Sequence, residues 1–146
     1  MNQLKTDHRL YFLGVLAVAA LSLTSFSPVA FGEEIKITLS GEQEVPPVKT
    51  AASGSGSITI NADMSVSGGV TTAGVAGTMA HIHQAAAGAN GPVIVPFVKN
   101  GDNGWAAPPG AKLTEAQYQA YKAGQLYVNV HSAENKGGEI RGQIKP

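Results

Sequence analysis

The sequence predicts an all-β domain, a Greek-key β-sandwich or flattened barrel with one short helix. Short runs of alternating apolar and polar residues recur along the chain, and Gly, Pro, Asn and Asp residues separate them. One segment carries clear signals of a helix start. Ile35, Ile37 and Leu39 open the series, because they alternate with polar residues as a half-buried strand does.

Proline and turn residues divide the next part of the chain. Pro46 and Pro47 exclude a position inside a sheet, because proline donates no amide hydrogen to it, so this segment is a connection or an edge. Residues 58–60 and 64–66 flank an Asn-Ala-Asp turn and predict a hairpin.

The second half of the chain continues the β pattern. A short, glycine-punctuated strand precedes residues 80–83, another strand is expected over 93–98, and residues 100–110 read as a loop. The strands containing residues 126–131 and 139–144 form the last hairpin, with a glycine-rich turn between them.

The single helix is expected over Glu115–Ala123. Thr114 can cap its first turn, and Gln117 three residues later completes a capping box. Gly124 ends the helix and delivers the chain into the strand that follows.

Residues 1–32 have the pattern of a cleavable signal peptide, in preference to a retained membrane anchor. Lys5 and Arg9 precede an apolar run over 10–23, and small residues around Ala30 and Gly32 suit a signal peptidase, with cleavage expected after Gly32. We therefore expect a secreted or periplasmic protein without a stable membrane span. The remaining residues, 33–146, suffice for one compact domain.

Charge and cysteine content restrict the function. After residue 32, eight basic residues and nine acidic ones give a net charge of −1 without clustering, so nucleic acid is not an expected partner. The absence of cysteine excludes disulfides, thiolate ligands and thiol nucleophiles. Stability must come from a packed core, or partly from a bound metal.

Three histidines are the main functional signal. His81 and His83 flank Ile82 in a strand, so their side chains project from one face about 7 Å apart while Ile82 points into the core. His131 lies on the polar face of the 126–131 strand. If the two strands come together, three imidazoles converge, a ligand set suited to copper or zinc. The alternative is three exposed histidines without a ligand.

The loop after His83 offers no further ligand before Asp102. A fourth protein ligand would come from Asp102, Glu134, Glu139 or another distant residue. An open position that takes water or substrate is the simpler interpretation, and open positions are where metal catalysis occurs.

Arg141 is the candidate for anion recognition. It lies on the polar face of the 139–144 strand with Glu139 and Gln143, and the hairpin can bring it near His131. A permanent positive charge beside a metal attracts small anions. The alternative is a solvated or carboxylate-paired arginine on an outer sheet face.

Four ordered segments resemble the chordin-type (CHRD) domain family. They are residues 39–48, 81–93, 127–131 and 138–144, and together they span almost the whole chain after residue 32. The resemblance implies an extracellular all-β module but names no activity.

The histidine and arginine segments also resemble, more distantly, the copper half of copper/zinc superoxide dismutases. This resemblance implies that His81, His83 and His131 bind copper and that Arg141 guides superoxide. The chain lacks the bridging histidine, the zinc ligands and the disulfide cysteines of that family. The implied site is therefore at most a copper-only one.

Three hypotheses follow. The protein is a copper-only superoxide dismutase whose substrate is a small anion, a copper-binding or copper-buffering protein without turnover, or an extracellular interaction module in which the histidines are incidental. The first two require the same histidines, and only the first requires Arg141.

Overall fold

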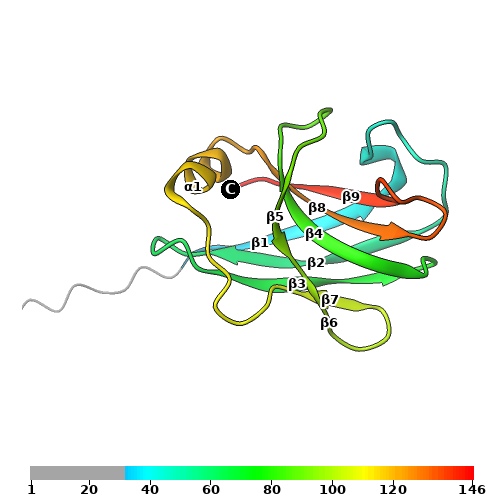
Figure 1. Cartoon of the computed structure of the whole chain (residues 1–146), viewed down its shortest axis with the longest axis horizontal. Helices are drawn as coiled ribbons and strands as arrows, with labels where there is room; N and C mark the ends of the chain where they lie inside the picture. The colour runs from blue at the N-terminus through cyan, green and yellow to red at the C-terminus, as the bar shows by residue number, and fades with distance from the viewer. Residues whose placement is uncertain (1–31) are drawn as a thin grey trace, which may run out of the picture.

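The computed structural model describes residues 32–146, which form an antiparallel β-sheet curled into a nearly closed barrel with one α-helix (Figure 1). The expected fold class is confirmed. Apart from Gly32, the predicted signal peptide lies outside the described residues. Within residues 32–146, no helix is long and apolar enough to cross a membrane.

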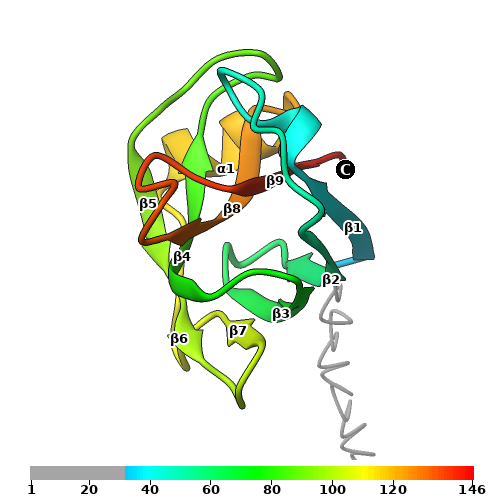
Figure 2. The same cartoon turned by 90° about the vertical axis from the view of Figure 1, so that its right-hand side faces the viewer.

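The sheet has nine strands in the order β5-β4-β8-β9-β1-β2-β3-β7-β6. Figure 2 shows the sheet curling from β4 through β8, β9 and β1 round to β2 and β3. Because the last two strands insert between β4 and β1, the two histidine-bearing segments become neighbours in space. The elements are β1 (Glu34–Ser40), the 3-10 helix η1 (Gly41–Gln43), β2 (Ser53–Ile60), β3 (Val66–Ala73), β4 (Gly77–Gln84), β5 (Val93–Pro96), β6 (Val98–Lys99), β7 (Gly104–Ala106), α1 (Glu115–Lys122), β8 (Leu126–Ser132) and β9 (Ile140–Ile144).

The pairing of β4 with β8 separates an apolar face from a polar one. Ile82 lies opposite Val128, and both side chains are fully buried in the hydrophobic core. The adjacent pair, His81 opposite Asn129, projects from the other face of the sheet, because residues directly opposite in a sheet share a face. The alternation predicted for these two segments is therefore confirmed.

Two local predictions were wrong. Residues 93–98 do not form one strand, because Phe97 interrupts them: β5 pairs with β4, whereas β6 pairs with β7 at the opposite end of the sheet order. The segment 100–110 is not entirely loop, since β7 lies inside it and buries Trp105. Its turn-type composition concealed a strand whose pairing with β3 is set by distant residues.

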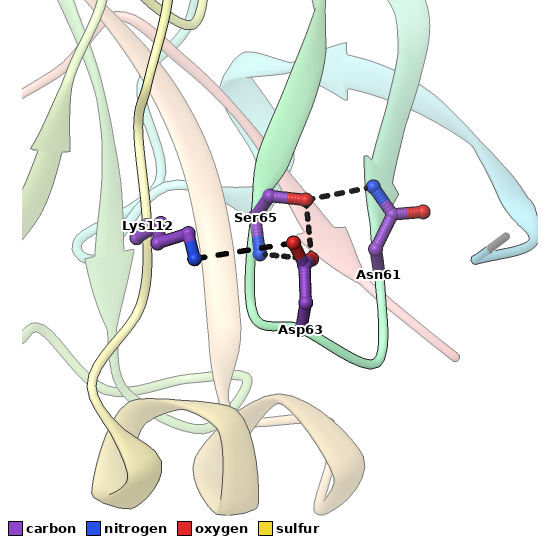
Figure 3. Close-up of polar contacts among 4 residues, drawn as sticks. All are labelled: Asn61, Asp63, Ser65 and Lys112. Atoms are coloured by element: carbon purple, nitrogen blue, oxygen red, sulfur yellow. Dashed lines mark hydrogen bonds and ion pairs between the residues drawn. The ribbon is translucent and has the colours of Figure 1, made fainter. Parts of the chain in front are cut away.

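The predicted hairpin forms between β2 and β3, and Figure 3 shows the polar contacts in its turn. Asp63 Oδ1 accepts hydrogen bonds from the backbone N–H of Ser65 at 3.0 Å and from its hydroxyl at 2.6 Å. Asn61 Nδ2 donates to the same hydroxyl at 2.9 Å. Lys112 Nζ lies 3.9 Å from Asp63 with both side chains largely exposed, so this ion pair adds little stability.

Helix α1 begins as predicted and ends one residue earlier than expected. Thr114 Oγ1 accepts from the Gln117 N–H at 3.3 Å, and Gln117 Oε1 accepts from the Thr114 N–H at 2.8 Å. This is the predicted capping box. Gly124 follows with a φ of +69°, the left-handed conformation that favours glycine at a helix end.

Replacing Thr114 with alanine should lower the free energy of unfolding by about 1 kcal/mol, because the first turn loses the acceptor for one of its free N–H groups. Urea denaturation measures this difference. Thr114→Ser keeps the hydroxyl and serves as the control with nearly unchanged stability. Equal stability of the alanine variant and the parent protein would contradict a stabilising role for this cap.

Candidate metal centre

The three predicted histidines converge on the polar face of β4 and β8. One ligand nitrogen from each of His81, His83 and His131 lies within 4.8 Å of the other two. His81 Nδ1 and His131 Nε2 are 3.0 Å apart. The predicted convergence is confirmed, and the arrangement could hold one metal ion.

Backbone carbonyls orient two of the three rings. His83 Nδ1 is 2.9 Å from the Gly91 carbonyl oxygen, and His131 Nδ1 is 2.8 Å from the Lys136 carbonyl oxygen. Since a carbonyl only accepts, both Nδ1 atoms carry the proton and both Nε2 atoms carry the lone pair that a metal could bind. The lone pair of His131 Nε2 faces His81 Nδ1 at 3.0 Å. Such outer contacts fix the tautomer in protein metal sites.

His83 Nε2 is buried and has no hydrogen-bond partner among the described residues. A buried polar atom without a partner costs stability unless another group satisfies it. A metal ion bound at this lone pair would satisfy it.

The environment favours neutral imidazoles. Burial, together with the neighbouring His131 and His83, lowers the pKa of His81 to about 4. Burial also lowers the pKa of His83, and this effect outweighs the hydrogen bond to Gly91. Because the neutral ring is the form that binds a metal, both side chains are in the ligand form at neutral pH.

The polar face that carries the histidines is largely buried rather than exposed. Every residue of β8 is buried, including His131 and Asn129, the latter at 1% exposure, and His83 on β4 is also buried. His81 alone of the three remains partly exposed. Strand alternation predicted that the face was polar, but not that it is covered.

None of the three acidic residues considered as a fourth ligand joins the cluster. Within residues 32–146, the candidate metal group consists of the three histidines alone. The Glu139 carboxylate accepts a hydrogen bond from the Thr50 hydroxyl at 2.8 Å, and Asp102 and Glu134 are exposed in loops. An open coordination position is therefore the interpretation that the geometry supports.

Arg141 is buried on β9, with 1% of its surface exposed, and within residues 32–146 it forms no close ion pair. Its Nη1 donates to the Ala89 carbonyl at 2.8 Å, and its Nη2 donates to the Ala86 carbonyl at 3.1 Å. These contacts tie the loop between β4 and β5 to the sheet. The anion-guide role of Arg141 stays a prediction, and this burial weighs against it.

Tyr127 separates Arg141 from the histidine cluster. The guanidinium carbon of Arg141 lies 3.4 Å from the centre of the Tyr127 ring, and the His83 ring stacks on Tyr127 at 4.8 Å with an interplanar angle of 8°. Since β8 lies between β4 and β9, the two contacts approach from opposite sides. The result is a cation, aromatic and imidazole stack across three strands.

Glu44, which follows η1, is a buried acid beside this stack. Its exposure is 4%, and burial raises its pKa to about 7, although the positive charge of Arg141 opposes the shift. Its Oε1 has no hydrogen-bond partner among the described residues. Glu44 is therefore partly protonated near neutral pH.

A pocket of about 410 Å³ lies between the segment after β1 and the loop between β4 and β5. Figure 2 shows these two segments beside each other at the top of the view. Asn90 Nδ2 donates to the Val45 carbonyl at 2.7 Å and links the two segments. No histidine of the cluster lines the pocket. Its lining residues are Glu42, Gln43, Glu44, Val45, Pro47, Ala87, Gly88, Arg141 and Gln143.

Sequence reasoning missed most of the supporting residues. Tyr127 and Asn129 share the face of His131 by strand alternation, but alternation does not indicate the stack with Arg141 or the burial of Asn129. The contacts of the histidines with the carbonyls of Gly91 and Lys136 could not be predicted, because every residue has a backbone carbonyl. Glu44 carried no signal of its burial beside an arginine.

Fold and site together define a small β-barrel domain with a largely buried three-histidine cluster. The model of the CHRD domain family matches residues 35–144, so the chain belongs to the CHRD domain family. No curated protein and no solved structure matches the chain. The first resemblance is therefore confirmed, whereas the resemblance to superoxide dismutases stays a hypothesis.

Proposed function

We propose that this protein is an exported CHRD-domain protein that binds one copper ion through His81, His83 and His131. The observation that carries the proposal is the convergence of three imidazole nitrogens within 4.8 Å. The carbonyl contacts that place the lone pairs of His83 and His131 on Nε2 support it, and so does the unpartnered Nε2 of His83.

Copper is the metal that suits this ligand set best. Imidazole binds both copper and zinc, but for a given set of nitrogen ligands Cu²⁺ binds more tightly than the other divalent first-row metals. Structural zinc sites use four protein ligands, and the group here contains three. Zinc is the alternative, and metal analysis of the purified protein would show which of the two metals is bound.

Binding without turnover is the better-supported form of the proposal. Guidance of superoxide to the metal requires a cation that the anion can reach. Arg141 has 1% of its surface exposed, and its guanidinium is engaged by loop carbonyls behind Tyr127. We therefore favour copper binding or buffering over superoxide dismutation.

Copper should raise the melting temperature of the untagged protein. A ligand that binds only the folded state at about 100 times its Kd adds roughly 2.7 kcal/mol of stability. His81→Ala should reduce this increment, and the triple alanine variant at His81, His83 and His131 should lose it. Differential scanning fluorimetry with and without copper measures the effect, and elemental analysis gives the expected stoichiometry of one.

His81→Ala is more informative than the single alanine variants of His83 and His131. His81 is partly exposed, and its ring makes no hydrogen bond to the backbone of residues 32–146. The His81→Ala protein should therefore fold without metal. If copper raises the melting temperature of the triple variant as much as that of the parent protein, the histidines are not the ligands.

A further inference from the structure

We propose that Met79 is a fourth ligand of the site and that its thioether binds copper in the Cu(I) state. This inference rests on the proposed copper site and deepens it, because it assigns the site a preference between oxidation states. The observation behind it is the position of Met79, directly opposite His131 in the pairing of β4 with β8.

The strand register places Met79 beside the cluster. Met79 precedes His81 by two residues on β4, and the intervening Ala80 is buried in the core at 1% exposure. Met79, His81 and His83 therefore share one face of the strand. Directly opposed residues have Cβ atoms about 4.5–5.5 Å apart, so the side chains of Met79 and His131 are immediate neighbours.

The side chain of Met79 is free to reach a metal ion. It is 49% exposed and does not belong to the hydrophobic core. The register of β4 against β8 shifts between Gly77 and Met79, an irregularity of the kind that redirects side chains at sheet edges and functional sites. Methionine has three rotatable side-chain bonds, so the sulfur of Met79 can reach the cluster. It would approach from the end of β4 that lies before His81, whereas His83 lies after His81.

Ligand chemistry explains why this position favours Cu(I). A thioether is a soft ligand that selects Cu(I), whereas Cu(II) and zinc are satisfied by imidazole nitrogen and by oxygen. The chain contains no cysteine, and within residues 32–146 no carboxylate joins the histidine group. Met79 therefore supplies the soft donor that the three imidazoles lack.

The variant Met79→Leu tests the proposal, because it removes the sulfur while conserving side-chain volume. Competition against a chromophoric Cu(I) chelator under anaerobic conditions should show that Met79→Leu binds Cu(I) at least about tenfold more weakly. Loss of an outer partner of a metal ligand already weakens binding about 10–100-fold, so loss of a direct ligand should cost at least tenfold. Cu(II) and zinc affinities should not change. Met64→Leu is the matched control, since Met64 lies in the β2–β3 turn and packs against the core, and it should leave Cu(I) affinity unchanged.

X-ray absorption of the Cu(I)-loaded protein gives an independent measurement. Because the chain has no cysteine, any sulfur bound to copper comes from methionine. A sulfur scatterer is expected in the parent protein and in Met64→Leu, and it should be absent from Met79→Leu. A parent protein that binds Cu(I) with nitrogen scatterers only, or with an affinity that Met79→Leu does not change, overturns the assignment of Met79. Failure of the copper-site proposal looks different, because the parent protein would then bind neither Cu(II) nor Cu(I).

Discussion

Arg141→Ala should lower the free energy of unfolding by about 3 kcal/mol, because it removes two hydrogen bonds from a charged donor, each of which contributes roughly 1.5–3 kcal/mol. The substitution leaves the carbonyls of Ala86 and Ala89 without their donors and removes the cation stacked on Tyr127. It also takes away the positive charge that opposes protonation of Glu44. Denaturation in guanidinium chloride at neutral pH measures the loss.

Arg141→Lys separates a structural role from anion guidance. Lysine keeps the positive charge but lacks the planar guanidinium that donates to two carbonyls at once. Arg141→Lys should therefore show most of the destabilisation expected for Arg141→Ala. Anion guidance requires the charge alone, and it is screened over a Debye length of about 8 Å at physiological ionic strength.

Stopped-flow measurement of superoxide decay by the copper-loaded variants tests the enzyme hypothesis directly. The binding proposal expects no decay beyond that of free copper, and no salt dependence that Arg141 controls. A normally stable Arg141→Ala protein that dismutates superoxide more slowly, with a flatter response to salt, would instead support the anion-guide role.

Glu44→Gln should stabilise the protein by about 3 kcal/mol at pH 8 and leave its stability unchanged below about pH 4.5, since one unit of pKa shift corresponds to 1.36 kcal/mol. The pKa of Glu44 is raised from 4.5 to about 7 on folding. The folded state therefore holds this proton more tightly than the unfolded state does. Stability from Glu44 is fully present below pH 4.5 and is lost as the pH rises through about 7.

Glutamine removes this dependence because it keeps the shape of the side chain and never ionises. Urea denaturation of both proteins at pH 4 and pH 8 measures the difference. Glu42→Gln is the matched control, because Glu42 lines the same pocket but is exposed, and its stability change should stay within about 0.5 kcal/mol. A Glu44→Gln protein that is no more stable than the parent at pH 8 would show that Glu44 is ionised without penalty.

Local patterns in the sequence determined the strands of the site and the faces of its ligands. Alternation over two residues is a property of the strand itself, so His81 and His83 had to project opposite to Ile82 wherever the strand lay. The capping box of Thr114 and Gln117 is equally local, and α1 begins where it predicts. These features could be predicted because each depends on neighbours within a few residues.

Only the tertiary structure decided that β8 lies beside β4 and that the polar face between them is covered. Sheet order depends on how the whole set of strands closes around one core, which no single segment encodes. The same long-range packing buries Arg141 under loop carbonyls and Glu44 beside it, and desolvation by that packing sets the pKa values of Glu44 and His81. The sequence by itself therefore determined which side chains could bind a metal, and tertiary packing decided that they meet, because desolvation and close approach arise only when distant segments come together.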